Sequence, residues 1–220
     1  MKKFYLLAIV TVGILFTGCE DDSTISSGKH KGHEFVDLGL TVKWATCNVG
    51  ADNPWDLGDF FAWGETKPKT EFTRDTYKWY ESGEGWKKYC STDNKFFLDA
   101  TDDAATANWG GNWRMPTYGE LQELVTNCTW TETIQKGILG YNVRGANGNS
   151  IFLPKTNDNT VDYLNGCGYW SCVLDQEYDD PEYSCAYYLD IEEDINLKGE
   201  CRWCYSFWRP YGCLVRPVYP

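Results

Sequence analysis

The chain has 220 residues and a formal net charge of −12 at pH 7, with 20 Lys and Arg against 32 Asp and Glu. This balance excludes a nucleic-acid-binding protein, which needs a basic footprint, and disfavours attraction to anionic membranes. Eleven Trp and 15 Tyr exceed what core packing alone requires, and these residue types dominate binding surfaces, so we expect a neutral glycan, a cation or a protein as partner.

The first 18 residues have the pattern of a cleavable export signal. Lys2 and Lys3 precede an apolar run at 4–16, which is shorter than the roughly 20 residues that span a bilayer and has the size of a signal-peptide core. The sequence FTGC at 16–19 resembles a bacterial lipobox, in which the Cys becomes the acylated first residue of the mature protein. We expect Cys19 to be the lipidation site; the alternative is a plain secretion signal with an incidental cysteine.

The acidic triplet at 20–22 resembles the surface-export signal of Bacteroidetes-type lipoproteins. It predicts a lipid-anchored protein on the outer face of the outer membrane, although a solvated linker is the alternative interpretation. The polar stretch at 23–32 predicts a flexible tether. We therefore expect a signal peptide at 1–18, a lipidated tether at 19–32 and one domain at 33–220, with a mature net charge of 18 − 32 = −14.

The N-terminal part of the domain predicts short strands. The segment 35–45 reads as two strands around a Gly turn, and 60–64 is a further apolar run. Residues 65–95 are polar and aromatic, and we expect a long surface excursion there.

Two helices are predicted next. The first covers 101–108, has acidic residues in its first turn and is stopped by Gly110 and Gly111. The second begins with a T-x-x-E capping box at 117–120, and its apolar face, which holds Leu121 and Leu124, is expected to be core.

The rest of the chain predicts strands. Segments 141–144 and 150–153 flank an Asn-Gly turn signal, 187–191 alternates as a half-buried strand with Tyr187 inward, and 213–218 reads as one strand. Strands, then two helices, then a strand-rich half predict the α+β class.

Nine cysteines remain after Cys19 is subtracted from the ten in the chain. Export permits disulfides, but an odd number leaves at least one thiol unpaired or paired between chains. The C-x-x-C at 201–204 lacks the second pair or the His ligands of a metal site and the βαβ context of a redox motif. We expect a structural or incidental role for it, and we expect neither a metal nor a cofactor.

The candidate catalytic groups are few. The only histidines, His30 and His33, lie near the expected tether, so we expect no Ser-His or Cys-His nucleophile in the domain body. The many Asp and Glu residues do not exclude a glycosidase, which uses a pair of carboxylates. They lie, however, in segments expected to be loops, which position acid–base groups poorly. The sequence therefore favours a protein that is not an enzyme.

Several strings resemble the Fibrobacter-type "major paralogous domain" family, and they follow its order over residues 35–220. They are VDLGL at 36–40, WATCNVGA at 44–51, GDFFAWGET at 58–66, NWGGNWRMPT at 108–117, NGNSIFLP at 147–154, GYWS at 168–171 and VRPV at 215–218. The resemblance implies a C-type-lectin-like fold, with two helices packed on small antiparallel sheets and a loop-rich C-terminal half. It also implies a surface lipoprotein, but it supplies no reaction.

The chain departs from the family pattern near its C-terminus. At 200–213 it reads ECRWCYSFWRPYGC, where the family commonly shows Ser- and Asn-rich strings. This pattern resembles the variable region of proteins diversified by retroelements, in which adenine-directed mutagenesis rewrites Asn and Ser codons. The hypothesis requires a near-copy of the 3′ end of the gene, differing mainly at adenines, nearby in the genome.

Aromatic residues interleaved with charges crowd the last fifth of the chain, and such surfaces stack on sugars or anchor protein partners. We expect the exposed contact set to be Trp203, Tyr205, Trp208, Arg209 and Tyr211, joined in ligand binding by Tyr188, Asp190 and Glu192. The expected function is a non-catalytic recognition module or adhesin for a glycan or a protein. The alternatives are a structural or accessory subunit of a surface glycan-capture assembly, or an enzyme.

Overall fold

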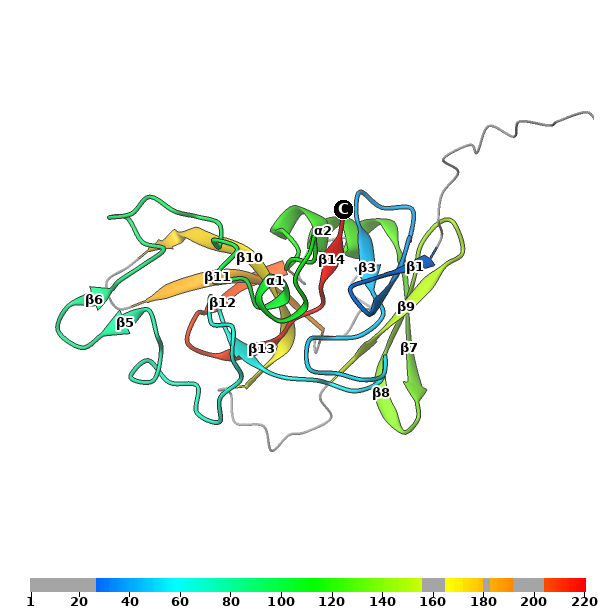
Figure 1. Cartoon of the computed structure of the whole chain (residues 1–220), viewed down its shortest axis with the longest axis horizontal. Coiled ribbons are helices and arrows are strands. Elements are labelled where there is room, and N and C mark those ends of the chain that lie inside the picture. Colours follow the sequence, from blue (N-terminus) through cyan, green and yellow to red (C-terminus); the bar gives the residue numbers. More distant parts are fainter. Residues whose placement is uncertain (1–26, 156–164, 180–182, 192–203) are drawn as a thin grey trace, which may run out of the picture.

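The computed structural model describes residues 27–155, 165–179, 183–191 and 204–220. The expectations for Cys19, the acidic triplet, Glu192, Cys201 and Trp203 lie outside these residues. The described part folds into two helices and four small sheets (Figure 1), which confirms the α+β class, with strands as the larger share. No helix in these ranges is long and apolar enough to cross a membrane.

One antiparallel sheet joins the two ends of the described chain. Its strands, in spatial order, are β1 (Ser27–His30), β2 (His33–Val36), β3 (Lys43–Ala45) and β14 (Val218–Tyr219). Lys31 and Gly32 both have positive φ, as a two-residue hairpin turn requires. The prediction of a flexible tether up to Gly32 is therefore wrong from Ser27 onward, because β2 supplies this polar segment with a backbone ladder.

The first helix, α1 (Ala104–Trp109), begins later than the sequence predicted. The carboxylate of Asp103 accepts a hydrogen bond from the Thr106 N–H and caps the helix, so Asp102 lies outside it. Asp102 instead pairs with Lys78 and Lys88. The predicted stop is confirmed, since Gly110 is the C-cap.

The second helix, α2 (Tyr118–Asn127), carries the predicted capping box and buries Leu121 and Leu124 in the main core. A three-stranded antiparallel sheet follows it in the chain. Its strands are β7 (Thr129–Gln135), β8 (Ile138–Arg144) and β9 (Ser150–Pro154). The Asn147-Gly148 hairpin between β8 and β9 is confirmed, with Gly148 at a φ of 89°.

The largest sheet crosses the centre of the molecule (Figure 1). In spatial order it contains β12 (Cys204–Trp208), β11 (Ser184–Asp190), β10 (Asn165–Asp179), β13 (Gly212–Leu214) and β4 (Phe61–Ala62). Only the β10–β13 pair is parallel. Two buried clusters pack on this sheet, one with α2 and one with α1.

The single strand predicted at 213–218 is wrong. The chain leaves the large sheet after Leu214 and joins the terminal sheet at Val218, so one apolar segment serves two sheets. Pro217 lacks an N–H and cannot continue a ladder on that side. The carbonyls of Val215 and Pro217 instead accept hydrogen bonds from Val49 and Ala45.

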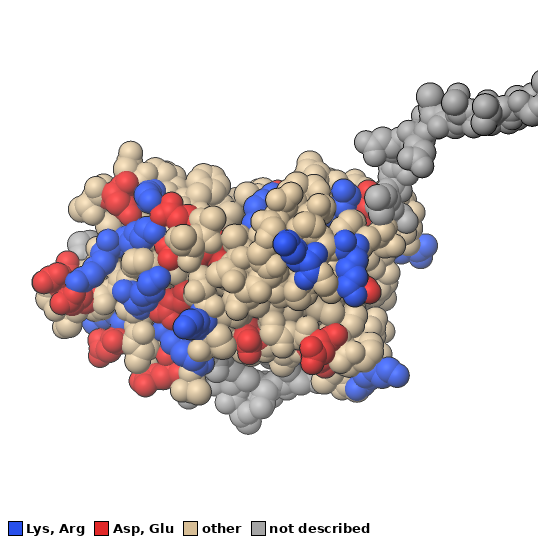
Figure 2. Space-filling view, viewed as in Figure 1, with Lys and Arg blue, Asp and Glu red and all other residues tan. Residues whose placement is uncertain are grey.

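The excursion at 65–95 is more than a surface loop. It contains the short hairpin of β5 (Tyr80–Glu81) and β6 (Gly85–Trp86) at one end of the molecule (Figure 1). Phe72, Tyr77 and Tyr89 from the same segment are buried. Figure 2 shows that positive and negative side chains gather, interleaved, over this end, whereas the middle of the same face carries fewer charges.

Several described cysteines are free thiols. They are Cys47, Cys90, Cys128, Cys172 and Cys185. The prediction that at least one thiol lacks a disulfide partner is therefore confirmed.

Candidate functional site

The candidate contact surface lies on β12, which stands at the edge of the large sheet within the described residues. β12 pairs with β11 in antiparallel register, with Tyr188 opposite Tyr205 and Cys185 opposite Trp208. Directly opposite residues of an antiparallel pair lie on the same face and successive side chains alternate, so Tyr205 and Trp208 point to opposite faces of the sheet.

We call Tyr183, Tyr205, Trp208 and Tyr211 the aromatic edge; three of them, Tyr183, Trp208 and Tyr211, form a connected row of rings. The centroid of Trp208 lies 5.9 Å from that of Tyr183 and 5.1 Å from that of Tyr211. Tyr183 is 60% exposed and Tyr205 is 38% exposed, and the other two rings are half-buried. The predicted site residues Trp208 and Tyr211 thus come together and Tyr183 joins them, whereas Tyr205 lies on the opposite face of β12.

Sequence reasoning missed Tyr183 as an exposed contact residue. It stands directly before β11, where the chain enters the sheet, and it is the first described residue after 180–182. The proximity of Pro181 was the available signal, because proline is depleted inside central strands and marks their ends.

Arg209 corrects the prediction most strongly, because it is 0% exposed and belongs to the interior. Its Nη1 donates to the carbonyls of Lys88 at 3.1 Å and Tyr89 at 2.8 Å. The guanidinium carbon lies 4.4 Å from the ring centroid of Trp86 and 5.8 Å from that of Tyr77. The excursion therefore folds over Arg209 and removes it from the contact surface.

Tyr188 was predicted as a contact residue, but it is buried, at 8% exposure. It packs among Trp170 and Phe207, and its hydroxyl donates to Asp190 at 3.0 Å. Tyr187 is half-buried and faces inward, as predicted, since its ring packs against Tyr118 of α2 at 4.1 Å between centroids. Strand β11 is therefore packed on both of its faces.

Tyr187 makes one further polar contact beneath the sheet. Its hydroxyl donates to the Asp175 carboxylate at 3.0 Å. Burial and this carboxylate raise the pKa of Tyr187 to about 12, so the hydroxyl stays protonated. The contact fixes the strand that supports the aromatic edge.

Four buried polar atoms near the aromatic edge have no hydrogen-bond partner among the described residues: Trp208 Nε1, Ser184 Oγ, Arg209 Nε and Arg209 Nη2. A buried polar atom without a partner costs free energy, so such atoms mark places where a ligand or water supplies the bond. Trp208 combines a half-buried ring in the row of the aromatic edge with such a nitrogen. It is the residue of this surface best suited to orient a ligand.

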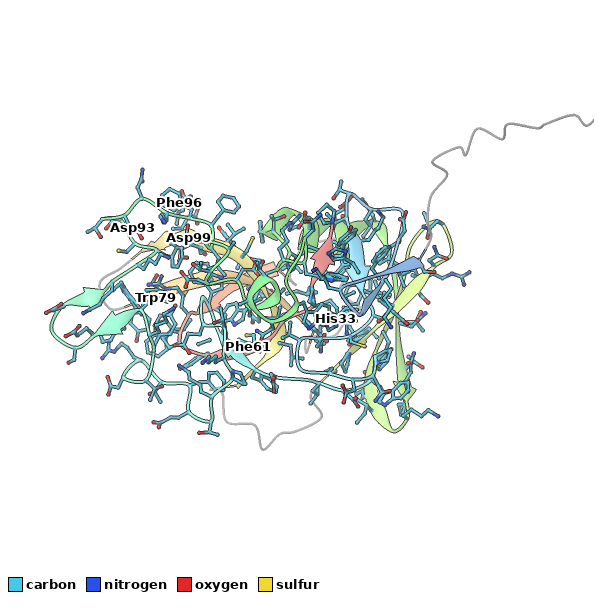
Figure 3. The ribbon with its side chains drawn as sticks, in the orientation of Figure 1. His33, Phe61, Trp79, Asp93, Phe96 and Asp99 are labelled. Atoms are coloured by element: carbon cyan, nitrogen blue, oxygen red, sulfur yellow. The ribbon has the colours of Figure 1, made fainter. Side chains whose placement is uncertain are left out.

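The histidines correct a second expectation, because β1 and β2 place both inside the folded domain. Figure 3 shows His33 in the half of the molecule that holds β1 and β3. Its ring stacks on Trp109 at 3.7 Å between centroids. Burial, and to a lesser extent the charge of Lys29, lowers the pKa of His33 below 6.5.

His33 and Cys47 line the same cavity of about 300 Å³, together with Glu34 and Asp52. The premise that the domain body contains no histidine is therefore wrong. The flat stack on Trp109 ties the imidazole to α1. No group of three His, Cys, Asp or Glu side chains suited to a metal ion occurs in the part of the chain that the structure describes.

The fold and the site thus define an α+β domain with an exposed aromatic sheet edge. No family model matches the chain, no curated protein is similar to it, and no solved structure matches its fold.

Proposed function

We propose that this chain is a surface-exposed lipoprotein whose domain, built on a C-type-lectin-like scaffold, binds a glycan or protein ligand without catalysing a reaction. The observation that carries the proposal is the aromatic edge, in which Tyr183, Trp208 and Tyr211 present a connected row of partly exposed rings. The pairing of Val218 with Trp44, which brings the two chain ends into one sheet, is compatible with that scaffold.

The rings of the aromatic edge suit recognition for two reasons. Tyr and Trp supply large apolar contact area together with a polar tip, and both have few rotatable bonds to immobilise. Their mutual contacts already restrict them before binding, which lowers the entropy lost in a complex. With Arg209 buried, the edge carries no described cation, and the proposal therefore favours a neutral ligand face.

A binding screen tests the proposal. Residues 27–220 would be applied to a glycan array and to intact bacterial and host cell surfaces, beside the variants Tyr183→Ala and Trp208→Phe. The second variant keeps a ring but removes the indole nitrogen. We expect both to weaken binding at least tenfold, because single aromatic hot spots contribute about 1–4 kcal/mol.

The matched control is Ile134→Ala, because Ile134 is 67% exposed on β7, in a different sheet. Its loss should leave binding unchanged. If the edge variants bind as the parent does while the control fails, the aromatic edge is not the contact surface. Absence of binding to every glycan and surface, with co-purification in a polysaccharide-uptake complex, would favour the accessory-subunit alternative.

The proposed location has its own test. The full chain expressed in a Bacteroidetes host should incorporate labelled palmitate, and Cys19→Ser should abolish the labelling. Protease added to intact cells should digest the parent protein at the surface. Retention of an unlabelled precursor in the cytoplasm would refute the lipoprotein assignment.

A further inference from the structure

A second cavity, of about 400 Å³, lies on a different part of the domain and shares no residue with the aromatic edge. It forms between the segment at 97–100, the loop after α1 and strand β10. Its lining residues include Phe97, Ala100, Asn112, Arg114 and Cys172. We call this cavity the Phe97 trough; Figure 3 labels the neighbouring Phe96 at the end of the molecule that carries the excursion.

The wall that carries Phe97 is held in place by backbone pairing. Phe97 forms an isolated antiparallel bridge with Val173 of β10. On either side, the Leu98 N–H donates to the Cys172 carbonyl at 3.0 Å, and the Leu174 N–H donates to the Phe96 carbonyl at 2.8 Å. The backbone is thus fixed while the Phe97 side chain remains 58% exposed. A large apolar ring that is held at the rim of a cavity is stronger evidence for a binding site than an isolated apolar residue elsewhere on the surface.

The ionisable groups that line the trough are already compensated. The Asp103 carboxylate accepts hydrogen bonds from the Met115 N–H at 2.9 Å and the Thr106 N–H at 2.9 Å, and burial raises its pKa. Arg114 makes a two-pronged ion pair with Glu120, at 2.8 and 2.5 Å. Because both charged groups already have partners within the protein, neither favours a ligand of opposite charge, and the trough suits an uncharged ligand.

Buried side chains form the floor of the trough, and an exposed polar side chain stands at its rim. Cys172 and Trp113 line the floor and are buried, and burial raises the pKa of the Cys172 thiol to about 12, which keeps it neutral. On the rim, Asn112 is exposed and offers an amide donor and acceptor. Its neighbour Gly111 has a φ of 63°, and a Cβ there would overlap the His30 ring, so this loop approaches the domain as only glycine allows.

These features resemble a small-molecule site, which is an apolar cavity of roughly 300–1,000 Å³ with a few polar groups that orient the ligand. We propose that the Phe97 trough binds a small uncharged aromatic molecule of one or two rings. The ring packs against Phe97 above the apolar floor, and a polar ring substituent or N–H bonds the Asn112 amide. This activity is separate from the proposed recognition at the aromatic edge and does not depend on it.

The test uses residues 27–220, which hold every described strand and helix, with indole as the probe in saturation-transfer NMR titrations. Ala100→Trp places a large ring in the trough from an exposed position, so it should block indole without disturbing the core. Phe97→Ala removes the exposed wall and should raise the dissociation constant about tenfold. Thermal melts of each variant confirm that the fold is retained.

Two controls separate this site from the other surfaces. Ile134→Ala removes a comparably exposed apolar side chain from β7, and Tyr183→Ala alters the aromatic edge; both should bind indole as the parent does. The proposal is overturned if indole does not saturate at millimolar concentration or if Ala100→Trp leaves its binding unchanged. Displacement of indole by cellobiose at lower concentration than by a second aromatic, p-cresol, would also overturn it in favour of a sugar site.

Discussion

Replacement of Arg209 by Ala tests whether this residue belongs to the contact surface or to the interior. A surface role predicts a stable variant with weakened ligand binding. The interior position predicts loss of stability, because Arg209 joins β12 to the excursion through the carbonyls of Lys88 and Tyr89 and through the ring of Trp86. The two interpretations therefore differ in a quantity that needs no knowledge of the ligand.

The magnitude follows from these contacts. Each hydrogen bond from a charged donor contributes about 1.5–3 kcal/mol, and a desolvated cation–π contact contributes about 2 kcal/mol. Removing the buried charge recovers several kcal/mol of desolvation free energy, so the gains do not add fully. We expect Arg209→Ala to lower the free energy of unfolding by about 3 kcal/mol, which shifts Tm by roughly 6–12 °C for a domain of this size.

Urea titration followed by Trp fluorescence measures the free energy, and hydrogen exchange shows where the structure opens. Amides of the excursion at 65–95 should lose protection before those of α2. Arg144→Ala is the control, because Arg144 is exposed on β8 and its loss should change stability by less than about 0.5 kcal/mol. If Arg209→Ala matches this control in its urea midpoint, the inferred anchoring of the excursion is refuted.

Three further predictions concern single groups. Since the folded pKa of His33 lies below 6.5, the unfolded chain binds more protons as the pH falls through 6.5, so stability present above pH 6.5 is lost on acidification. NMR titration of the ring should give a midpoint below 6.5, and a midpoint above 6.5 contradicts the stacked, half-buried position. Thr117→Ala removes half of the capping box and should lower the free energy of unfolding by about 1 kcal/mol, as measured by thermal melts. Thr117→Ser keeps the hydroxyl and should retain most of this stability. Equal losses for the two variants would assign the effect to the lost methyl group. Burial raises the pKa of Cys128 to about 11 and that of Cys172 to about 12. Iodoacetamide at pH 8 should therefore label both thiols at least about tenfold more slowly in the folded protein than in the urea-unfolded protein, as measured by mass spectrometry. Equal labelling rates would show that these thiols are open to solvent.

Local signals in the sequence determined the helices and the hairpins. The capping box at Thr117, the stop at Gly110 and the Asn147-Gly148 turn all rest on contacts between residues a few positions apart. Such contacts form in the same way whatever the rest of the fold does, which is why the structure confirms them. The crowding of Trp and Tyr near the C-terminus likewise predicted contact residues there.

Long-range pairing decided what those signals left open. The segment at 213–218 divides between two sheets because Val218 finds its partner in Trp44, near the other end of the chain. The polar stretch from Ser27 becomes a strand because β2 satisfies its backbone. Neither partner can be identified from the local sequence, since an apolar or a polar run suits several neighbours equally well.

For the candidate site, too, the sequence indicated one part and the tertiary structure decided the other. Composition alone indicated that the chain offers aromatic side chains for binding. Which of them reach solvent depended on the strand order, which places Tyr188 on the inner strand β11 and Tyr205 on the edge strand β12, and on the excursion that covers Arg209. The local sequence does not tell which strand stands at the edge of a sheet, so only the assembled tertiary structure could decide this.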